Sequence, residues 1–179
     1  MNTPGLAGQV AVVAGATRGI GLAVAYQLAG SGVSLVINGR DPDAVDAAVA
    51  EIRGSGGYAV GVRGSAGEES VAQQLVDTAL GEFGALDIAV NCAGIAEPAG
   101  STVLTITTDE FRAQLDAHLM SAFHLTRAAG RVFADQGSGS IVLTGSAASL
   151  GMFGGSGYPA AKGGVNALAL AVAADLGPS

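Results

Sequence analysis

The sequence predicts an α/β fold built on a doubly wound parallel sheet. Short apolar runs alternate with segments of helical periodicity along its 179 residues, and this alternation is typical of parallel strands joined by helical crossovers. Hydrophobic residues make up 49% of the chain and 29 residues are glycine, which suits helices packed closely on a sheet with tight turns. A chain of this length is expected to form a single domain, residues 1–179.

The first unit of the pattern, residues 10–21, organises the chain. The apolar run over residues 10–14 is continuous, as in a strand buried on both faces of a parallel sheet. The helix that follows has Ile20, Val24 and Leu28 on one face. Because free N–H groups and a partial positive charge at a helix start favour an anion, the turn before it is predicted to hold a phosphate group. This turn contains three glycines, which are Gly15, Gly19 and Gly21.

The rest of the chain repeats the pattern. Strands are predicted over residues 33–37, 58–62, 86–90 and 140–144, and helices over residues 41–54, 68–83, 107–134 and 158–176. Asp41 before Pro42 is a typical helix N-cap. Thr107 and Glu110 are predicted to form a capping box. Right-handed crossovers then give about five strands in the order 3-2-1-4-5, with ligands expected beyond the strand ends where the order reverses.

Charge and cysteine content exclude several classes of partner. The net charge of -7 and the isoelectric point near 4.5 argue against nucleic acid, which is bound through clustered Lys and Arg. The chain shows neither a basic region followed by an apolar core near its start nor an apolar run long enough to span a bilayer. We therefore expect no membrane partner and a cytoplasmic location. Cys92 is the only cysteine, so an internal disulfide and a thiolate metal site are excluded, and no metal is expected.

Three motifs carry a resemblance to a known family over nearly the whole chain. They are a glycine-rich turn, a short motif after the fourth strand, and a Tyr–Lys pair with an upstream serine. In this sequence they read Ala14-Gly15-Ala16-Thr17-Arg18-Gly19-Ile20-Gly21, Asn91-Cys92-Ala93-Gly94, and Ser146 with Tyr158-Pro159-Ala160-Ala161-Lys162. The chain thereby resembles the short-chain dehydrogenase/reductase family, and most of all its 3-oxoacyl-carrier-protein reductases. The resemblance implies a Rossmann-type dinucleotide-binding domain.

The resemblance also implies a function. It indicates an oxidoreductase that transfers a hydride between a nicotinamide ring and a carbonyl or secondary-alcohol carbon of a small molecule, with 3-oxoacyl compounds as one candidate. Carbonyl reduction needs a proton donor at the substrate oxygen, and alcohol oxidation needs a base there. The phenol of Tyr158 is predicted to serve in both directions, with Lys162 supplying a positive charge from the same helix face. Ser146 is expected to hold the substrate oxygen. The predicted catalytic residues are Ser146, Tyr158, Lys162 and His118, the last standing where the family usually has an asparagine.

Each assignment has a structural alternative. A Tyr and a Lys four residues apart can be a simple surface pair, and Ser149 lies close enough in the sequence to compete with Ser146. Asn91 can serve only to hold the fourth strand in register. His118 can be a buried structural histidine, as we expect for His124.

The cofactor is predicted to be NADP(H) rather than NAD(H). Relatives that prefer NAD place an acidic residue at the end of the second strand, where this sequence has Gly39 followed by Arg40. Arg18 adds a second cation near the expected 2′-phosphate, although Arg40 can also be an ordinary exposed arginine. Asp41 could restore NAD binding, but its place before Pro42 favours a helix cap. The predicted cofactor-binding residues are Gly15, Thr17, Arg18, Gly19, Ile20, Gly21, Arg40, Asn91, Ala93, Gly94, Tyr158 and Lys162.

The chain departs from the family pattern at three places. Ala14 replaces the usual threonine of the glycine turn. Gly64 stands where the family usually has an aspartate after the third strand, so a contact to the adenine amino group is expected to be missing. After residues 174–179 the family continues into a sixth strand, a substrate-covering segment and a seventh strand, and these parts are expected to be absent here.

Two expectations follow from the last departure. The fifth strand, residues 140–144, becomes a sheet edge with unpaired backbone groups, and the final helix loses part of its packing surface. We therefore expect a homo-oligomer formed through this region, or a chain that is part of a longer enzyme. The alternative to an oxidoreductase is a shortened nucleotide-binding or interaction module of the same fold without useful turnover.

Overall fold

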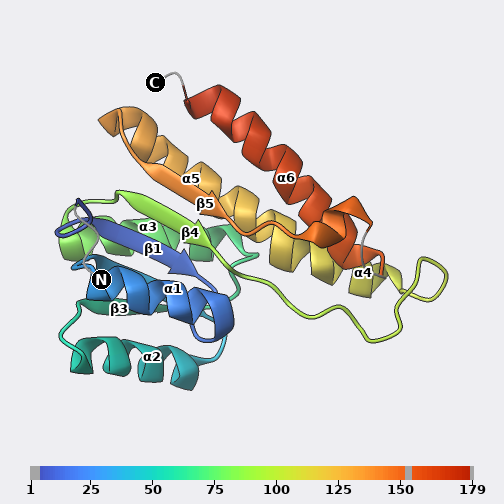
Figure 1. Ribbon diagram of the computed structural model, residues 1–179, viewed down its shortest axis with the longest axis horizontal. Helices are drawn as coiled ribbons and strands as arrows, with labels where there is room; N and C mark the ends of the chain where they lie inside the picture. The colour runs from blue at the N-terminus through green and yellow to red at the C-terminus, as the bar shows by residue number, and fades with distance from the viewer. Residues whose placement is uncertain (1–4, 152–154, 178–179) are drawn as a thin grey trace.

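Five parallel strands form one sheet in the computed structural model, which describes residues 5–151 and 155–177 (Figure 1). They are β1 (Val10–Ala14), β2 (Ser34–Gly39), β3 (Ala59–Arg63), β4 (Ile88–Asn91) and β5 (Ser140–Leu143). Their order is β3-β2-β1-β4-β5, which confirms the predicted order. The connections reverse direction between β1 and β4, and the last residues of these strands, Ala14 and Asn91, are paired in the sheet.

Helices cover both faces of this sheet (Figure 1). α1 (Gly19–Gly30) and α2 (Pro42–Gly54) pack on one face, and α3 (Glu69–Phe83) and α5 (Ser121–Gln136) pack on the other. α4 (Thr108–Gln114) runs into α5 through a π-helical turn, η1 (Leu115–Met120). α6 (Gly157–Leu176) follows a short 3-10 turn, η2 (Ala147–Leu150), and packs against η1, η2, α4 and α5.

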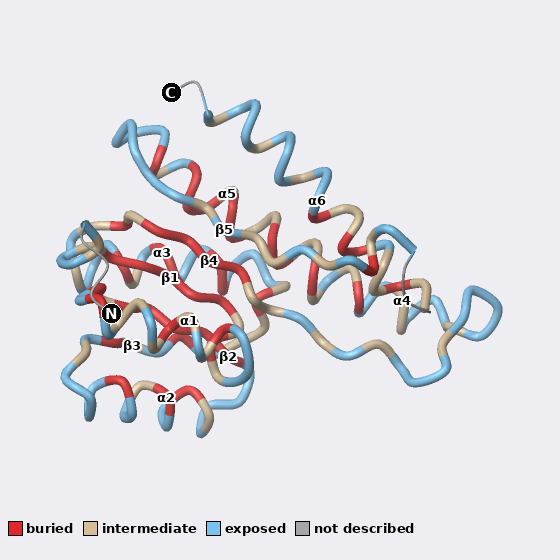
Figure 2. The backbone as a smooth tube through the Cα atoms, in the orientation of Figure 1, coloured by how far each residue is buried: buried red, intermediate tan, exposed pale blue. Residues whose placement is uncertain are grey.

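The central strands are buried on both sides because helices cover both faces. All five residues of β1 are buried, and Figure 2 shows β1, β2 and β4 as almost continuous buried segments. Successive side chains alternate between two apolar clusters, as the pleat of a strand requires. Val12 packs with Leu75 and Leu125 on the α3 and α5 side. Val13 packs with Ile52 on the α1 and α2 side. This double burial explains why the predicted strands read as continuous apolar runs.

Side chains cap the starts of α2 and α4 by hydrogen bonds to backbone N–H groups. The Asp41 carboxylate accepts hydrogen bonds from the backbone N–H groups of Asp43, at 3.0 Å, and Ala44, at 3.4 Å. The backbone N–H of Thr107 donates to the Glu110 carboxylate at 2.8 Å, and the backbone N–H of Glu110 donates to the Thr107 hydroxyl at 3.2 Å. The predicted N-cap and the predicted capping box are both confirmed.

The structure differs from the sequence prediction at two helices. The helix predicted over residues 107–134 contains the π-helical turn η1 in its first half, which the apolar periodicity did not reveal. The predicted apolar face of the first helix was wrong at Ile20, whose side chain is 67% exposed. α1 instead buries Gly21 and Ala25, because small residues let it lie close to the sheet.

The C-terminal part of the chain is the least covered (Figure 2). β5 pairs with β4, and no other described strand pairs with it. Val142 in β5 is 52% exposed and Leu170 in α6 is 76% exposed. A separate groove of about 380 Å³ is lined by residues of α5, β5 and α6, among them Phe133, Ile141 and Leu176. Residues 1–4 and 178–179 of the predicted domain, and residues 152–154, lie outside the described residues.

None of the described helices combines the length and the apolar character that crossing a membrane requires.

Candidate functional site

The carboxyl ends of β1, β2 and β4 border a cavity of about 760 Å³, a size usual for small-molecule sites. It lies where the strand order reverses, which is where open α/β sheets bind ligands. Nine predicted cofactor-binding residues line it: Gly15, Thr17, Arg18, Gly19, Ile20, Gly21, Arg40, Ala93 and Gly94. The other three, Asn91, Tyr158 and Lys162, are not among the lining residues.

Close backbone contacts shape the glycine turn at this cavity. A Cβ atom on Gly15 would lie 2.7 Å from the N and Cα atoms of Ala93, so only glycine lets the turn touch the chain after β4. A Cβ atom on Gly21 would collide with the carbonyl oxygen of Gly15. Gly19 has a φ of +57° and open space around its Cα atom. At these glycines the turn therefore brings backbone close to the cavity wall.

The first turn of α1 is open to an anion. Arg18, the N-cap residue, makes no side-chain hydrogen bond to the helix, and no acidic residue lies in the first turn. The N–H groups at this helix start are thus left for a ligand, and the helix dipole favours a negative one. The exposed side chain of Arg18 borders the same cavity.

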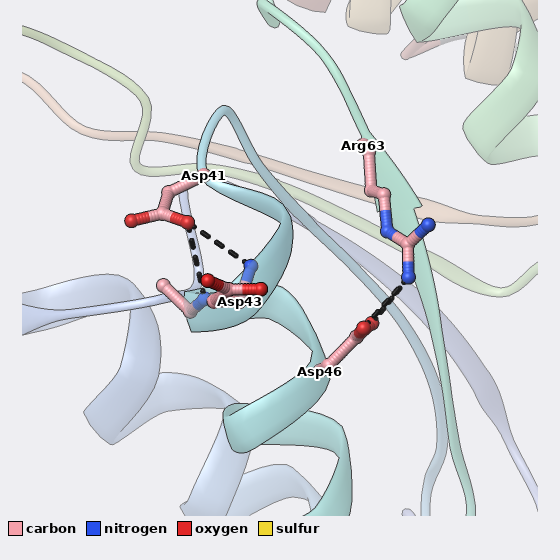
Figure 3. A network of polar contacts seen from close by, with 5 residues as sticks. Asp41, Asp43, Asp46 and Arg63 are labelled. Atoms are coloured by element: carbon pink, nitrogen blue, oxygen red, sulfur yellow. Dashed lines mark hydrogen bonds and ion pairs between the residues drawn. The ribbon is translucent and has the colours of Figure 1, made fainter.

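The end of β2 offers the cation of Arg40 and a carboxylate, Asp41, that caps the next helix. A Cβ atom on Gly39 would collide with the Thr17 side chain, so an acidic residue could not stand there without moving Thr17. Arg40 is exposed, lines the cavity, and forms no ion pair with any described residue. Asp41 also lines the cavity, and its Oδ1 atom accepts both hydrogen bonds from the start of α2, as Figure 3 shows.

The third arginine of this region has a partner of its own. Arg63 donates to both carboxylate oxygens of Asp46, at 2.8 and 2.7 Å, across β3 and α2 (Figure 3). Hydrogen bonds to Asp46 raise the pKa of the Arg63 guanidinium. Arg63 does not line the cavity, whereas Arg18 and Arg40 do.

The residues that line the cavity after β3 are not the one that the family pattern indicates. Gly64, the position matched to the family aspartate, does not line the cavity, whereas Ser65, Ala66 and Gly67 do. The Ser65 hydroxyl accepts a hydrogen bond from the backbone N–H of Gly67 at 3.3 Å. Ser65 is thus a polar residue of the cavity that the sequence reasoning missed.

Lys162 is the only lysine of the sequence, and its side chain is buried. The Nζ atom donates a hydrogen bond to the backbone carbonyl of Thr144, just after β5, at 2.6 Å. No carboxylate of the described residues forms an ion pair with it. Burial lowers the pKa of the Lys162 ammonium below its ordinary value, because water no longer stabilises the charge.

Tyr158 lies between two buried basic side chains. The Nζ atom of Lys162 is 5.9 Å from the centre of the Tyr158 ring. On the other side, the His118 and Tyr158 rings meet edge to face, with their centres 4.9 Å apart. Tyr158 and Lys162 come from the first two turns of α6, and His118 comes from η1. The structure therefore brings three of the four predicted catalytic residues together.

His118 is held by the chain that follows β4. Its Nε2 atom is 3.0 Å from the carbonyl oxygen of Ile95, to which it donates when it carries the ring proton, and 3.3 Å from the Ile95 nitrogen. Its Nδ1 atom is buried and has no partner among the described residues. A Cβ atom on Gly94 would collide with the imidazole. Gly94, a predicted cofactor-binding residue, therefore also makes room for His118.

Burial also lowers the pKa of the His118 imidazole. The hydrogen bond with Ile95 opposes this shift, and the charge of Lys162 adds to it. The ring lies in a π-helical turn, a feature that occurs often at functional sites.

Asn91 connects the elements behind the cavity. Its side-chain N–H donates to the Ser121 hydroxyl at 3.1 Å, and its side-chain oxygen accepts from the backbone N–H of Ala93 at 2.8 Å. Its backbone carbonyl accepts hydrogen bonds from the backbone N–H and the hydroxyl of Thr144. Asn91 thus joins the ends of β4 and β5 to α5, which is the structural role kept open above.

The two candidate serines differ in their hydrogen bonds. The Ser149 hydroxyl donates to the Ser146 carbonyl at 2.7 Å and accepts from the Asn166 side-chain amide at 2.8 Å. Its hydrogen atom is therefore already used within the protein. The Ser146 hydroxyl accepts from the backbone N–H of Ala148 at 3.1 Å and donates to no acceptor among the described residues. Ser146, two residues beyond Thr144, is therefore the serine with a hydrogen atom available to a substrate oxygen.

These features of the cavity fit a nicotinamide dinucleotide. An uncapped helix start, a backbone-lined turn and two arginines suit phosphate groups. The cavity extends from this end to Ile95, whose backbone holds His118 beside Tyr158. A dinucleotide in the cavity would thus have its phosphates at α1 and its other end toward the Tyr158 cluster.

Comparisons with known proteins agree with this geometry. The model of the short chain dehydrogenase family matches residues 9–179. The chain is 37% identical to a 3-oxoacyl-[acyl-carrier-protein] reductase of Synechocystis sp. over 96% of its own length. It is 37% identical to the short-chain reductase protein NovJ of Streptomyces niveus over 94% of its length. A crystal structure of a short chain dehydrogenase from Mycobacterium avium superposes with a TM-score of 0.89 at 34% identity and covers 97% of the chain.

The chain is shorter than these proteins. It covers 69% of the Synechocystis reductase, 64% of NovJ and 64% of the Mycobacterium avium chain.

The buried imidazole of His118 predicts a loss of stability in mild acid. Its pKa in the folded protein lies below the ordinary value of 6.5, so between those two values the unfolded chain binds more protons than the folded chain. The contribution of the neutral ring is complete above pH 6.5 and is lost as the pH falls toward the folded-state pKa. We expect the urea midpoint to fall more steeply below pH 6.5 in the wild type than in His118→Asn. Parallel midpoint curves for the two proteins would show that His118 does not titrate on unfolding.

Proposed function

The chain belongs to the short-chain dehydrogenase family, and on this premise we propose that it is an NADP-dependent oxidoreductase that interconverts carbonyl and secondary-alcohol groups. The observation that carries the proposal is the cluster of Tyr158, Lys162 and His118 beside the cavity at the strand ends. A phenol flanked by a buried ammonium is a suitable acid and base for a substrate oxygen.

Each side chain of the cluster has a distinct role in the proposal. The Tyr158 Oη atom gives its proton to the substrate oxygen during reduction and takes it back during oxidation. The ammonium of Lys162 favours the phenolate form of Tyr158, because little in the buried site screens its charge. The free hydrogen of the Ser146 hydroxyl holds the substrate oxygen. His118 packs against the Tyr158 ring and limits its movement. Bound in the cavity, the nicotinamide would supply or accept the hydride.

The cofactor preference rests on the end of β2. Arg40 and Arg18 line the cavity without an ion-pair partner among the described residues, and a 2′-phosphate would give them one. The collision of any Cβ atom at Gly39 with Thr17 disfavours the acidic residue that would bind the ribose hydroxyls of NAD. The capping role of Asp41 keeps its carboxylate at the start of α2. These contacts support NADP(H) over NAD(H).

The proposal also covers the class of substrate, the assembly and the location of the protein. The similarity to a 3-oxoacyl-[acyl-carrier-protein] reductase supports a small carbonyl compound of the 3-oxoacyl kind. The exposed face of α6 and the unpaired side of β5 support a homo-oligomer, which light scattering would reveal as a mass above that of one chain. A single cysteine and an acidic composition are compatible with a cytoplasmic location.

Tyr158→Phe is expected to abolish ketone reduction, with a loss of at least about 10³-fold in kcat, because only the proton donor is removed. NADPH binding, measured by fluorescence titration, should stay close to that of the wild type. Lys162→Ala should weaken both activity and NADPH binding. A phenylalanine variant that kept most of its rate would move the proton transfer to another residue. A wild-type chain that bound NADPH and reduced no ketone would favour a nucleotide-binding module.

Arg40→Ser is expected to weaken NADPH binding by about tenfold and to leave NADH binding unchanged, because a charge-assisted hydrogen bond contributes about 1.5 kcal/mol or more. Arg131→Ser is the matched control, since Arg131 is an exposed arginine of α5 and does not line the cavity. Fluorescence titration of both cofactors measures the difference. The cofactor proposal fails if the wild type binds NADH as tightly as NADPH.

A further inference from the structure

The segment between β4 and α4 carries a carboxylate that reaches the helix of Tyr158. The Glu97 Oε1 atom accepts hydrogen bonds from the backbone N–H groups of Ser156, at 2.9 Å, and Gly157, at 2.7 Å. Gly157 is the first residue of α6 and Tyr158 is the second. Glu97 therefore binds the backbone directly before the proposed proton donor, from a position some 60 residues earlier in the chain.

α6 has no cap from its own residues. Ser156 is its N-cap residue, but the Ser156 side chain makes no cap hydrogen bond, and no acidic residue lies in the first turn. The first N–H groups of a helix need a partner, and a carboxylate is the one that the helix dipole favours most. Glu97 supplies both the hydrogen-bond acceptor and the negative charge.

The chain before α6 is shaped to admit this carboxylate. Gly155 has a φ of +102°, and a Cβ atom there would collide with the Oε2 atom of Glu97. Glycine at this position thus provides both the left-handed backbone and the space for the carboxylate.

The residues next to Glu97 are tied to other elements of the site. The carbonyl oxygen of Ile95 lies 3.0 Å from the His118 ring, and the carbonyl of Ala96 accepts a hydrogen bond from the buried Gln114 side chain at 3.0 Å. Three consecutive residues therefore connect the end of β4 to η1, α4 and α6. His118 and Tyr158, which meet edge to face, are held by neighbouring residues of one short segment.

We infer that Glu97 is a positioning residue, whose carboxylate holds the first turn of α6 and thereby sets the place of Tyr158 relative to His118 and the cofactor cavity. The inference rests on the proposed oxidoreductase function for its effect on rate. Glu97 accepts hydrogen bonds from backbone N–H groups and is not among the residues that line the cavity. Its charge also acts on His118, whose pKa it raises against the lowering by burial. Its loss should therefore lower kcat while the affinity for NADPH stays the same.

The test combines hydrogen–deuterium exchange with steady-state kinetics on the full chain. Glu97→Ala is expected to increase amide exchange in the peptide covering residues 156–162 and to lower kcat by about tenfold or more, because a catalytic group misplaced by an ångström can cost about 10²-fold. The Kd for NADPH should be unchanged. Glu97→Gln keeps an acceptor oxygen in place, so it should restore the exchange protection and a kcat within about threefold of the wild type.

Glu110→Ala is the matched control, because it removes a carboxylate that caps a different helix, α4. It should raise exchange near residues 107–111 and leave residues 156–162 protected. Unchanged exchange at residues 156–162 in Glu97→Ala would overturn the inference, and so would a kcat equal to the wild type despite increased exchange. If the wild type reduces no ketone, the proposed function fails, and the exchange data alone decide whether Glu97 holds α6.

Discussion

The buried ammonium of Lys162 is the interaction on which the rest of the site depends. It is the only lysine of the sequence, it is buried, and no described carboxylate pairs with it. Removing such a charge from water costs several kcal/mol, and a single hydrogen bond to the Thr144 carbonyl offsets only part of that cost. The remaining cost is reduced by any negative charge that develops nearby, and the ring of Tyr158, on the same helix, lies 5.9 Å from the Nζ atom. In the proposed function, this cost favours the phenolate of Tyr158 and hence its proton transfer.

The sheet makes this arrangement rigid. Asn91 ends β4, and its carbonyl holds Thr144 after β5, while the Thr144 carbonyl holds Lys162. The position of the ammonium is therefore set by backbone groups at two neighbouring strand ends. From the opposite side, the segment after β4 fixes His118 through Ile95. The proposed acid and base residues and the proposed nucleotide cavity are consequently both positioned by the carboxyl edge of a parallel sheet whose central strands are buried on both faces.

Features that depend on nearby residues could be predicted from the sequence, and features that depend on distant ones could not. The Asp41 cap, the Thr107 capping box and the pairing of Tyr158 with Lys162 are set within one or two helical turns. The alternation of strands and helices predicted the fold class, and the resemblance to a Rossmann-type domain implied the sheet order. The residues of η1 include neither glycine nor proline, so the sequence predicted one continuous helix through His118. Glu97 looks like any loop carboxylate until the fold brings α6 beside it. Ile20 was misjudged because an apolar residue at a helix start can face a ligand cavity as well as a core.

The most direct test of the account is the fate of a labelled hydride. NADPH carrying deuterium at both positions of C4 of the nicotinamide would be incubated with the chain and a small 3-oxo ester, and the products examined by mass spectrometry. The account predicts an alcohol with one deuterium on its carbinol carbon, formed by the wild type and lost in Tyr158→Phe. Tight NADPH binding without any deuterated alcohol in the wild type would contradict it.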